Sequence, residues 1–179
     1  MTSMRTVAVI IFVAMAAFFV ACFYAGIFDE VGMSVSEQGP YCLVYREHTG
    51  PYRDVRFVRI DVCTYLRDRG DAVPARSFVR LLDNPQKVKP ENQRSIAGYV
   101  TDSLLPNVQP PYKTDIFPRT RAVSAVFPIR SFLSQITGPL KFYPRLFRYC
   151  GREKLETNGP VFELYDSAAK KIEYVAPVK

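Results

Sequence analysis

Hydrophobic residues follow two different patterns along the chain. Residues 7–26 (VAVIIFVAMAAFFVACFYAG) form an apolar run without a charged residue. As an α-helix, a run of this length is about 30 Å long, which matches the hydrocarbon core of a bilayer. From residue 39 onward, short apolar stretches alternate with polar residues and are separated by Gly and Pro. The sequence therefore predicts an N-terminal segment (1–26) with a transmembrane anchor, followed by a folded domain that covers 39–179.

Three interpretations of the apolar run stay open. A transmembrane anchor is favoured, because the run is longer than the apolar region of an ordinary signal peptide. A cleaved signal peptide is an alternative, since several alanines in the run offer small residues for a cleavage site. Lipidation at Cys22 is the third, but the apolar sequence continues past this cysteine to Phe28.

Charges on either side of the run indicate its orientation. Arg5 and the amino terminus precede the run, whereas Asp29 and Glu30 follow it. Positive charge is enriched on the cytoplasmic side of membrane segments. These charges predict a single-pass protein with a cytoplasmic N-terminus and its folded domain on the other side of the membrane.

Residues 27–38 are interpreted as a short stalk, and residues 39–102 as a unit of strand, helix, strand and strand. The first strand is rich in β-branched and aromatic residues, and alternation places Tyr45 and Val44 on opposite faces. The helix carries an apolar stripe and is expected to end at Gly70. The expected elements are a strand at 41–47, a helix at 53–69 and strands at 77–82 and 94–100.

Residues 119–178 repeat this order after a segment, 103–119, that contains four prolines and is interpreted as a linker. The helix of this half is expected to be interrupted at Gly138-Pro139, with Pro144 in the first turn of its second part. The expected elements are a strand at 121–127, a helix at 131–155 and strands at 159–165 and 171–178.

The two halves predict the fold class. A duplicated strand–helix–strand–strand unit gives an α+β domain, in which an antiparallel sheet carries its helices on one side. Such a domain is expected to have a groove on the open face of the sheet or between the two repeats.

Charge and cysteine content exclude several classes of function. The net charge of +7 and pI of 9.3 favour an anionic partner such as a membrane surface. The basic residues are interspersed with acidic ones, so no nucleic-acid partner is expected. The cysteines lack the spacing of zinc or redox sites and are expected to be buried thiols, although one disulfide among the last three stays open. They are Cys22, Cys42, Cys63 and Cys150.

Several motifs resemble a known family, the GyrI-like small-molecule-binding (effector-binding) domain. Residues 45–52 (YREHTGPY) resemble its entry motif, and residues 161–165 (VFELY) with 172–178 (IEYVAPV) resemble its closing hairpin. Within the family, the anchor and further motifs are similar to a membrane-anchored branch that includes a testis-expressed ER-phagy receptor. These motifs are residues 82–91, 122–128 and 143–147. The domain of that relative faces the cytosol, which conflicts with the charge-based orientation, so the side of the membrane stays open.

The resemblance implies a binding site for small molecules. The family uses an acidic residue of the closing hairpin to hold flat cations among aromatic groups, and Glu163 occupies the matching position. A carboxylate in an apolar groove has a desolvation cost that a bound cation relieves, and aromatic faces attract cations. The candidate aromatic residues of the groove are Tyr45, Tyr99, Phe127 and Tyr165. The alternatives are an ion pair on an edge strand for Glu163 and core packing for the aromatic residues.

No cofactor or metal is expected. His48 is the only histidine, and a hydrogen bond within its turn is favoured over metal binding. Haem ligation by His48 is kept as an alternative, because the SOUL-type haem-binding proteins have a comparable duplicated fold.

The sequence thus favours a membrane-tethered module that binds a small amphipathic or cationic molecule in a groove between two repeats. A protein-interaction adaptor at a membrane, without a small ligand, is the first alternative. A small hydrolase that pairs Glu163 with Tyr45 or Tyr165 is the second, although no nucleophile with a neighbouring base is visible.

Overall fold

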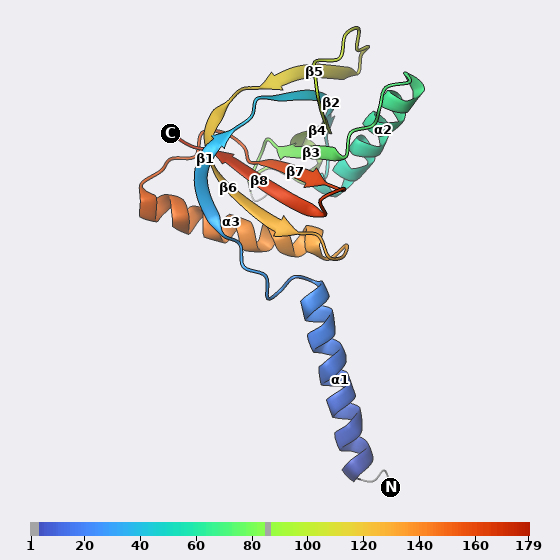
Figure 1. Ribbon diagram of the computed structural model, residues 1–179, viewed down its shortest axis with the longest axis vertical. Helices are drawn as coiled ribbons and strands as arrows, with labels where there is room; N and C mark the ends of the chain where they lie inside the picture. Colours follow the sequence, from blue (N-terminus) through green and yellow to red (C-terminus); the bar gives the residue numbers. More distant parts are fainter. Residues whose placement is uncertain (1–3, 85–86) are drawn as a thin grey trace.

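The computed structural model describes residues 4–84 and 87–179, in which a curved sheet carries two helices while a third helix extends away from it (Figure 1). The helices are α1 (Met4–Tyr24), α2 (Val55–Asp68) and α3 (Ser134–Glu153), with short 3-10 turns at Tyr52–Asp54 and Pro90–Asn92. The strands are β1 (Met33–Gln38), β2 (Tyr41–Thr49), β3 (Arg76–Leu81), β4 (Arg94–Thr101), β5 (Tyr112–Phe117), β6 (Thr120–Pro128), β7 (Phe162–Asp166) and β8 (Lys171–Pro177).

The sheet confirms the predicted duplication. Its eight strands are antiparallel and follow the order β1-β6-β8-β7-β3-β4-β2-β5. The block β6-β8-β7 is the mirror order of β3-β4-β2, as expected when a β2-α2-β3-β4 unit is repeated as β6-α3-β7-β8. The two units meet where β3 pairs with β7, with Phe78 opposite Leu164.

Both helices of the repeats pack on the same face of the sheet. The stripe of α2 buries Val62 and Leu66 against Val44 of β2, and α3 buries Phe142 and Leu146 in its own cluster. The helical interpretation of residues 53–69 was therefore correct. Gly70 ends α2 with a positive φ of 78°, and the next backbone N–H donates to the carbonyl oxygen of Leu66.

The opposite face of the sheet is covered by a bent two-stranded ribbon. In one of its strands β1 continues into β2, and in the other β5 continues into β6. Only two residues separate β1 from β2, and two separate β5 from β6. The pairing register continues unchanged through the bend. Gln38 lies opposite Thr120 before it, and Tyr41, three residues on, lies opposite Phe117, three residues back. At the bend, a side chain on Gly39 would approach the Pro118 carbonyl oxygen to 3.0 Å, and the φ of Gly39 is +85°.

A second core of stacked aromatic rings lies on this face. The ring of Phe162 lies 4.8 Å from that of Phe78, 4.9 Å from that of Phe117 and 5.9 Å from that of Tyr41. The ribbon therefore buries apolar groups that an open sheet would expose to water. Each face of the sheet has its own core, one beneath the helices and one beneath the ribbon.

Two segments that were expected to lie outside the sheet belong to it. Residues 103–119 were interpreted as a linker, but Tyr112–Phe117 forms β5 and pairs with β2. The prolines flank this strand and leave its interior free to pair. Residues 27–38 were interpreted as a stalk, but Met33–Gln38 forms β1 and pairs with β6. Both strands lie at an edge of the sheet and contain many polar residues. The alternation of apolar and polar residues that indicates a strand is therefore weak in them.

The predicted interruption of the second helix was also wrong. Helix α3 continues through Gly138, Pro139 and Pro144. A Cβ atom on Gly138 would lie 2.5 Å from the Tyr174 hydroxyl, so this glycine allows the helix to approach the sheet. The buried side of α3 keeps the helix on the sheet across both prolines, and Pro144 lies in its interior.

Helix α1 is long and apolar enough to cross a membrane, although a signal sequence would have the same properties. The segment that follows it is bound to the start of α3. The ammonium group of Lys141 donates to the carbonyl oxygens of Gly26 and Asp29, at 2.7 Å each. Arg130 forms an ion pair with Asp29 at 2.7 Å. The end of α1 is thus connected to the domain by direct polar contacts.

Gly98 offers a test of the β2–β4 pairing. A Cβ atom at this position would lie 1.9 Å from the Val44 carbonyl oxygen. We expect Gly98→Ala to lower the free energy of unfolding by about 3 kcal/mol, because the two strands must separate. The matched control is Gly151→Ala on α3, where an added Cβ atom would meet no described group within 4 Å beyond the neighbouring backbone of its own helix, and it should raise stability by up to about 1 kcal/mol. Denaturant unfolding of both variants measures this, and equal stabilities would contradict the pairing.

Candidate functional site

A groove lies between the two repeats on the helical face of the sheet. Its floor comes from β3 and β7, and its walls come from residues 52–59, at and before the start of α2, and from residues 132–143, at and before the start of α3. The cavity measures about 560 Å³, which is in the range of sites for drug-sized molecules. The floor residues are Val79, Leu81, Glu163 and Tyr165, and the walls include Arg59, Phe132, Ile136 and Tyr143.

Glu163 is the most unusual residue of this groove. Its side chain is a buried carboxylate on a central strand, with 4% of the residue exposed. The Tyr165 hydroxyl donates to one carboxylate oxygen at 2.7 Å and the Tyr143 hydroxyl donates to the other at 3.0 Å. In the described part of the chain Glu163 forms no ion pair, so the alternative of an edge-strand ion pair does not apply.

Burial dominates the electrostatics of the site. Removal from water raises the pKa of Glu163, while the two hydroxyl donors and the nearby charge of Arg59 act in the opposite direction. Burial also raises the pKa of Tyr165 and of Tyr143, so both hydroxyl groups stay protonated and serve as donors. The guanidinium group of Arg59 lies 4.6 Å from the ring centre of Tyr165. The result is an oriented acidic group in a largely apolar groove.

The predicted site residues fall into different parts of the molecule. Glu163 and Tyr165 lie together on the floor of the groove. Tyr45 lies on the other face of the sheet, where it lines a second pocket, so it cannot form a pair with Glu163. Tyr99 packs beneath α2, where burial and a hydrogen bond with Cys63 raise its pKa to about 12. Phe127 is fully buried beneath α3.

Sequence reasoning missed the residues that the helices contribute. Tyr143 is the second donor to Glu163, and Arg59 covers the ring of Tyr165. A signal for Tyr143 exists in hindsight, because Ile136, Pro139 and Tyr143 recur at helical spacing and line the groove. That signal was hidden by the expected break at Gly138-Pro139.

His48 lies in β2, outside the groove. Its Nε2 atom is buried without a hydrogen-bond partner among the described residues, and a side chain on Gly50 would approach it to 3.1 Å. Over residues 4–84 and 87–179, no group of three or more His, Cys, Asp or Glu side chains could hold a metal ion. The four cysteines are free thiols, with Cys22 and Cys150 buried.

Comparison with known proteins shows the fold. No protein-family model matches the chain, and no curated protein matches it. Among solved structures, the C-terminal domain of EcmrR superposes with a TM-score of 0.63 at 14% identity, over 83% of this chain and 98% of that domain. EcmrR in its DNA complex gives 0.62 at 12% identity, over 99% of this chain and 73% of that one. A hydrolase from Listeria innocua gives 0.52 at 11% identity, over 82% and 91%.

These neighbours share the α+β fold of this chain, as the duplicated pattern of its sequence predicted. At identities between 11% and 14% the likeness concerns the fold. The chemistry of this chain must therefore be argued from its own groove.

The raised pKa of Glu163 leads to a pH-dependent stability. The unfolded chain ionises this carboxyl near pH 4.3, whereas the folded chain ionises it at a higher pH. As pH rises from about 4 through the folded pKa, the wild-type melting temperature should fall relative to that of Glu163→Gln. Tyr143→Phe removes one donor to the carboxylate and should enlarge the fall. A difference that stays constant with pH would show that burial does not control this ionisation.

Proposed function

We propose that the chain is a membrane-tethered binding module whose groove takes a small amphipathic cation. One observation carries this proposal, namely the buried carboxylate of Glu163, which two tyrosine hydroxyls hold in place and which forms no ion pair with a basic side chain of the described residues. A cation at this position would relieve the cost of burying the charged form. The hydroxyl donors would keep the carboxylate oriented while the ligand exchanges.

Charges on the α2 wall restrict how such a ligand can lie. Three arginines, Arg53, Arg56 and Arg59, line that side of the groove against a single acidic residue, Asp54, so this wall would repel a cation. The cationic group is therefore expected beside Glu163 on the α3 side, against the Tyr143 ring. An apolar body would then extend along two exposed residues, Phe132 just before α3 and Ile136 in its first turn.

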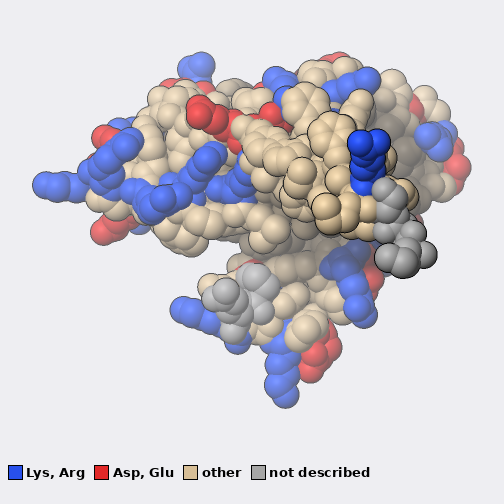
Figure 2. Space-filling model, turned by 90° about the horizontal axis from the view of Figure 1, so that it is seen from below, with Lys and Arg blue, Asp and Glu red and all other residues tan. Residues whose placement is uncertain are grey.

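The membrane tether is supported by the contacts at the end of α1. The Ser131 hydroxyl donates to the Tyr24 carbonyl oxygen at 2.9 Å, and Lys141 holds the following turn. If α1 lies in a bilayer, the start of α3 lies at its surface. The exposed side of α3 carries Leu140 and Phe147 there. Figure 2, which views the molecule from below, shows Lys and Arg gathered at the left of this face, as suits anionic headgroups.

Ligand binding is tested with rhodamine 6G, a flat cationic dye, and the full chain in detergent micelles. We expect saturable binding to wild type and roughly tenfold or greater weakening in Glu163→Gln, because a charge-assisted contact is lost. The affinity of wild type should also rise with pH through the folded pKa of Glu163, since the cation binds the ionised form. Isothermal titration calorimetry, corrected for dye uptake by empty micelles, measures both effects.

The matched control is Glu173→Gln, which removes a carboxylate paired with Arg76 and Lys171 on the other face of the sheet. This variant should bind the dye as wild type does. Equal affinity of wild type and Glu163→Gln would contradict the proposed site. No binding to any variant would favour the protein-interaction adaptor.

The tether is tested with tryptophan reporters, because the chain contains no tryptophan. Phe12→Trp in α1 and Leu140→Trp on α3 should be quenched by brominated lipids in reconstituted vesicles. Ile116→Trp, an exposed position on β5, serves as the control and should be quenched much less. If the Phe12 reporter is not quenched, α1 is not in the bilayer. If only the Leu140 reporter is not quenched, α1 is inserted but α3 stands clear of the surface.

A further inference from the structure

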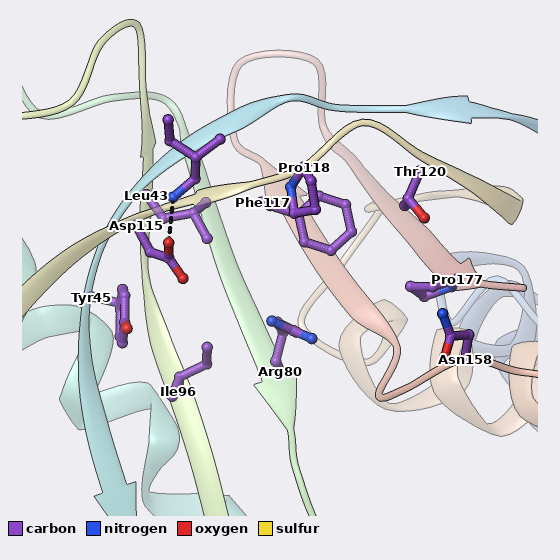
Figure 3. Close-up of a pocket in the computed structure, with 11 residues that line it drawn as sticks. Leu43, Tyr45, Arg80, Ile96, Asp115, Phe117, Pro118, Thr120, Asn158 and Pro177 are labelled. Atoms are coloured by element: carbon purple, nitrogen blue, oxygen red, sulfur yellow. Dashed lines mark hydrogen bonds between the residues drawn. The ribbon is translucent and has the colours of Figure 1, made fainter.

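The face of the sheet opposite the groove contains a second pocket. It has a volume of about 220 Å³ and is lined by residues of β2, β3, β4 and β5, by Thr120 at the start of β6, by Pro177 at the end of β8, and by Asn158. Figure 3 shows Arg80 at its centre, with Tyr45 and Ile96 on one side, Pro177 and Asn158 on the other, and Phe117 above. The pocket is thus built around the guanidinium group of a residue on a central strand.

Arg80 has no hydrogen-bond acceptor in the described part of the chain. Within residues 4–84 and 87–179, its Nε atom is buried without a hydrogen-bond partner and its guanidinium group forms no ion pair. The guanidinium group lies 5.7 Å from the ring centre of Phe117 and 5.8 Å from that of Phe162, and the charge of Asp115 stabilises it without forming an ion pair. A partly buried guanidinium group with unused donors is costly unless an acceptor occupies the pocket.

Arg76 shows what a satisfied arginine looks like on the same strand and face. It lies four residues before Arg80 on β3, and its guanidinium group forms an ion pair with Glu173 at 3.2 Å. It also covers the ring of Tyr41. The two arginines therefore share strand, face and aromatic contacts, but only Arg76 has a carboxylate partner among the residues described.

The other groups of the pocket indicate which anion fits. Asp115 carries a negative charge on the rim, and its Oδ1 atom accepts from the backbone N–H of Ile116 at 2.7 Å. One arginine beside one aspartate favours a monoanion over a phosphate dianion, since the aspartate repels additional negative charge. The Tyr45 hydroxyl and the Asn158 amide add possible donors, and Leu43 adds apolar surface.

We propose that this pocket is a second ligand site, in which Arg80 binds the carboxylate of a small molecule whose apolar body rests on Leu43, Ile96 and Phe117. A guanidinium group matches a carboxylate with two parallel hydrogen bonds, which supplies both affinity and orientation. The site is independent of the cation groove, because the two open on opposite faces of the sheet.

Benzoate is the probe for this site, and the full chain in detergent micelles is titrated by calorimetry. Wild type should bind benzoate saturably, whereas benzamide, its neutral analogue of the same shape, should bind much more weakly. Arg80→Gln keeps a polar side chain at the position and should weaken benzoate binding roughly tenfold or more. Arg76→Gln is the matched control and should leave the affinity within about twofold of wild type. Melting temperatures establish that each variant is folded.

The outcomes separate this site from the groove. Glu163→Gln should bind benzoate with the affinity of wild type. The proposal for one site can therefore be rejected without affecting the proposal for the other. Equal affinity of Arg80→Gln and wild type would overturn the proposal, as would the absence of saturable benzoate binding to the wild-type chain. Binding of inorganic phosphate in preference to benzoate would overturn the assignment to a carboxylate.

Discussion

The pairing of β3 with β7 is the contact on which the rest of the structure depends. It is the junction between the two repeats; it forms the floor of the groove, and its strand β3 places Arg80 in the second pocket. Val79 lies opposite Glu163 on the helical face, and Arg80 lies opposite Phe162 on the other face. Because side chains alternate along a strand, neighbouring positions of this pair point to opposite sides of the sheet. One strand pair thus presents a buried acid to one surface and an arginine to the other.

The duplication does not produce two equivalent acidic sites. On the helical face, β3 of the first repeat carries Ser77, Val79 and Leu81, and so presents no carboxylate beside Glu163. The carboxylate therefore belongs to the second repeat only. The repeats supply matching walls and a common floor, while a difference at one floor position decides where charge is buried. Because of this asymmetry, the groove contains an acidic group and is not only an apolar contact between the two repeats.

Sequence patterns predicted the internal part of the fold but not its edges. The stripe of residues 53–69 and the alternation in residues 121–127 were sufficient, because burial imposes a period on those segments. Strands β1 and β5 lacked such a period, since edge strands are defined by their pairing partners.

The candidate site was predicted in part for the same reason. Alternation within one strand places Glu163 and Tyr165 on the same face, and the sequence contains that information directly. The face occupied by Tyr45 depends on how several strands are registered, and the contribution of Tyr143 depends on an uninterrupted α3. Both are tertiary properties that local sequence does not encode.

The polar contacts between the end of α1 and α3 have a mechanical consequence. Thr137 and Lys141 of α3 donate to the carbonyl oxygens of Ala25 and Gly26, directly after α1. Helix α1 is therefore connected directly to the α3 wall of the groove. A displaced α1 would pull on α3 directly, and α3 carries the tyrosine that orients Glu163. A change in the thickness of a surrounding bilayer would change the tilt of α1, and the resulting shift of α3 would change the shape of the groove.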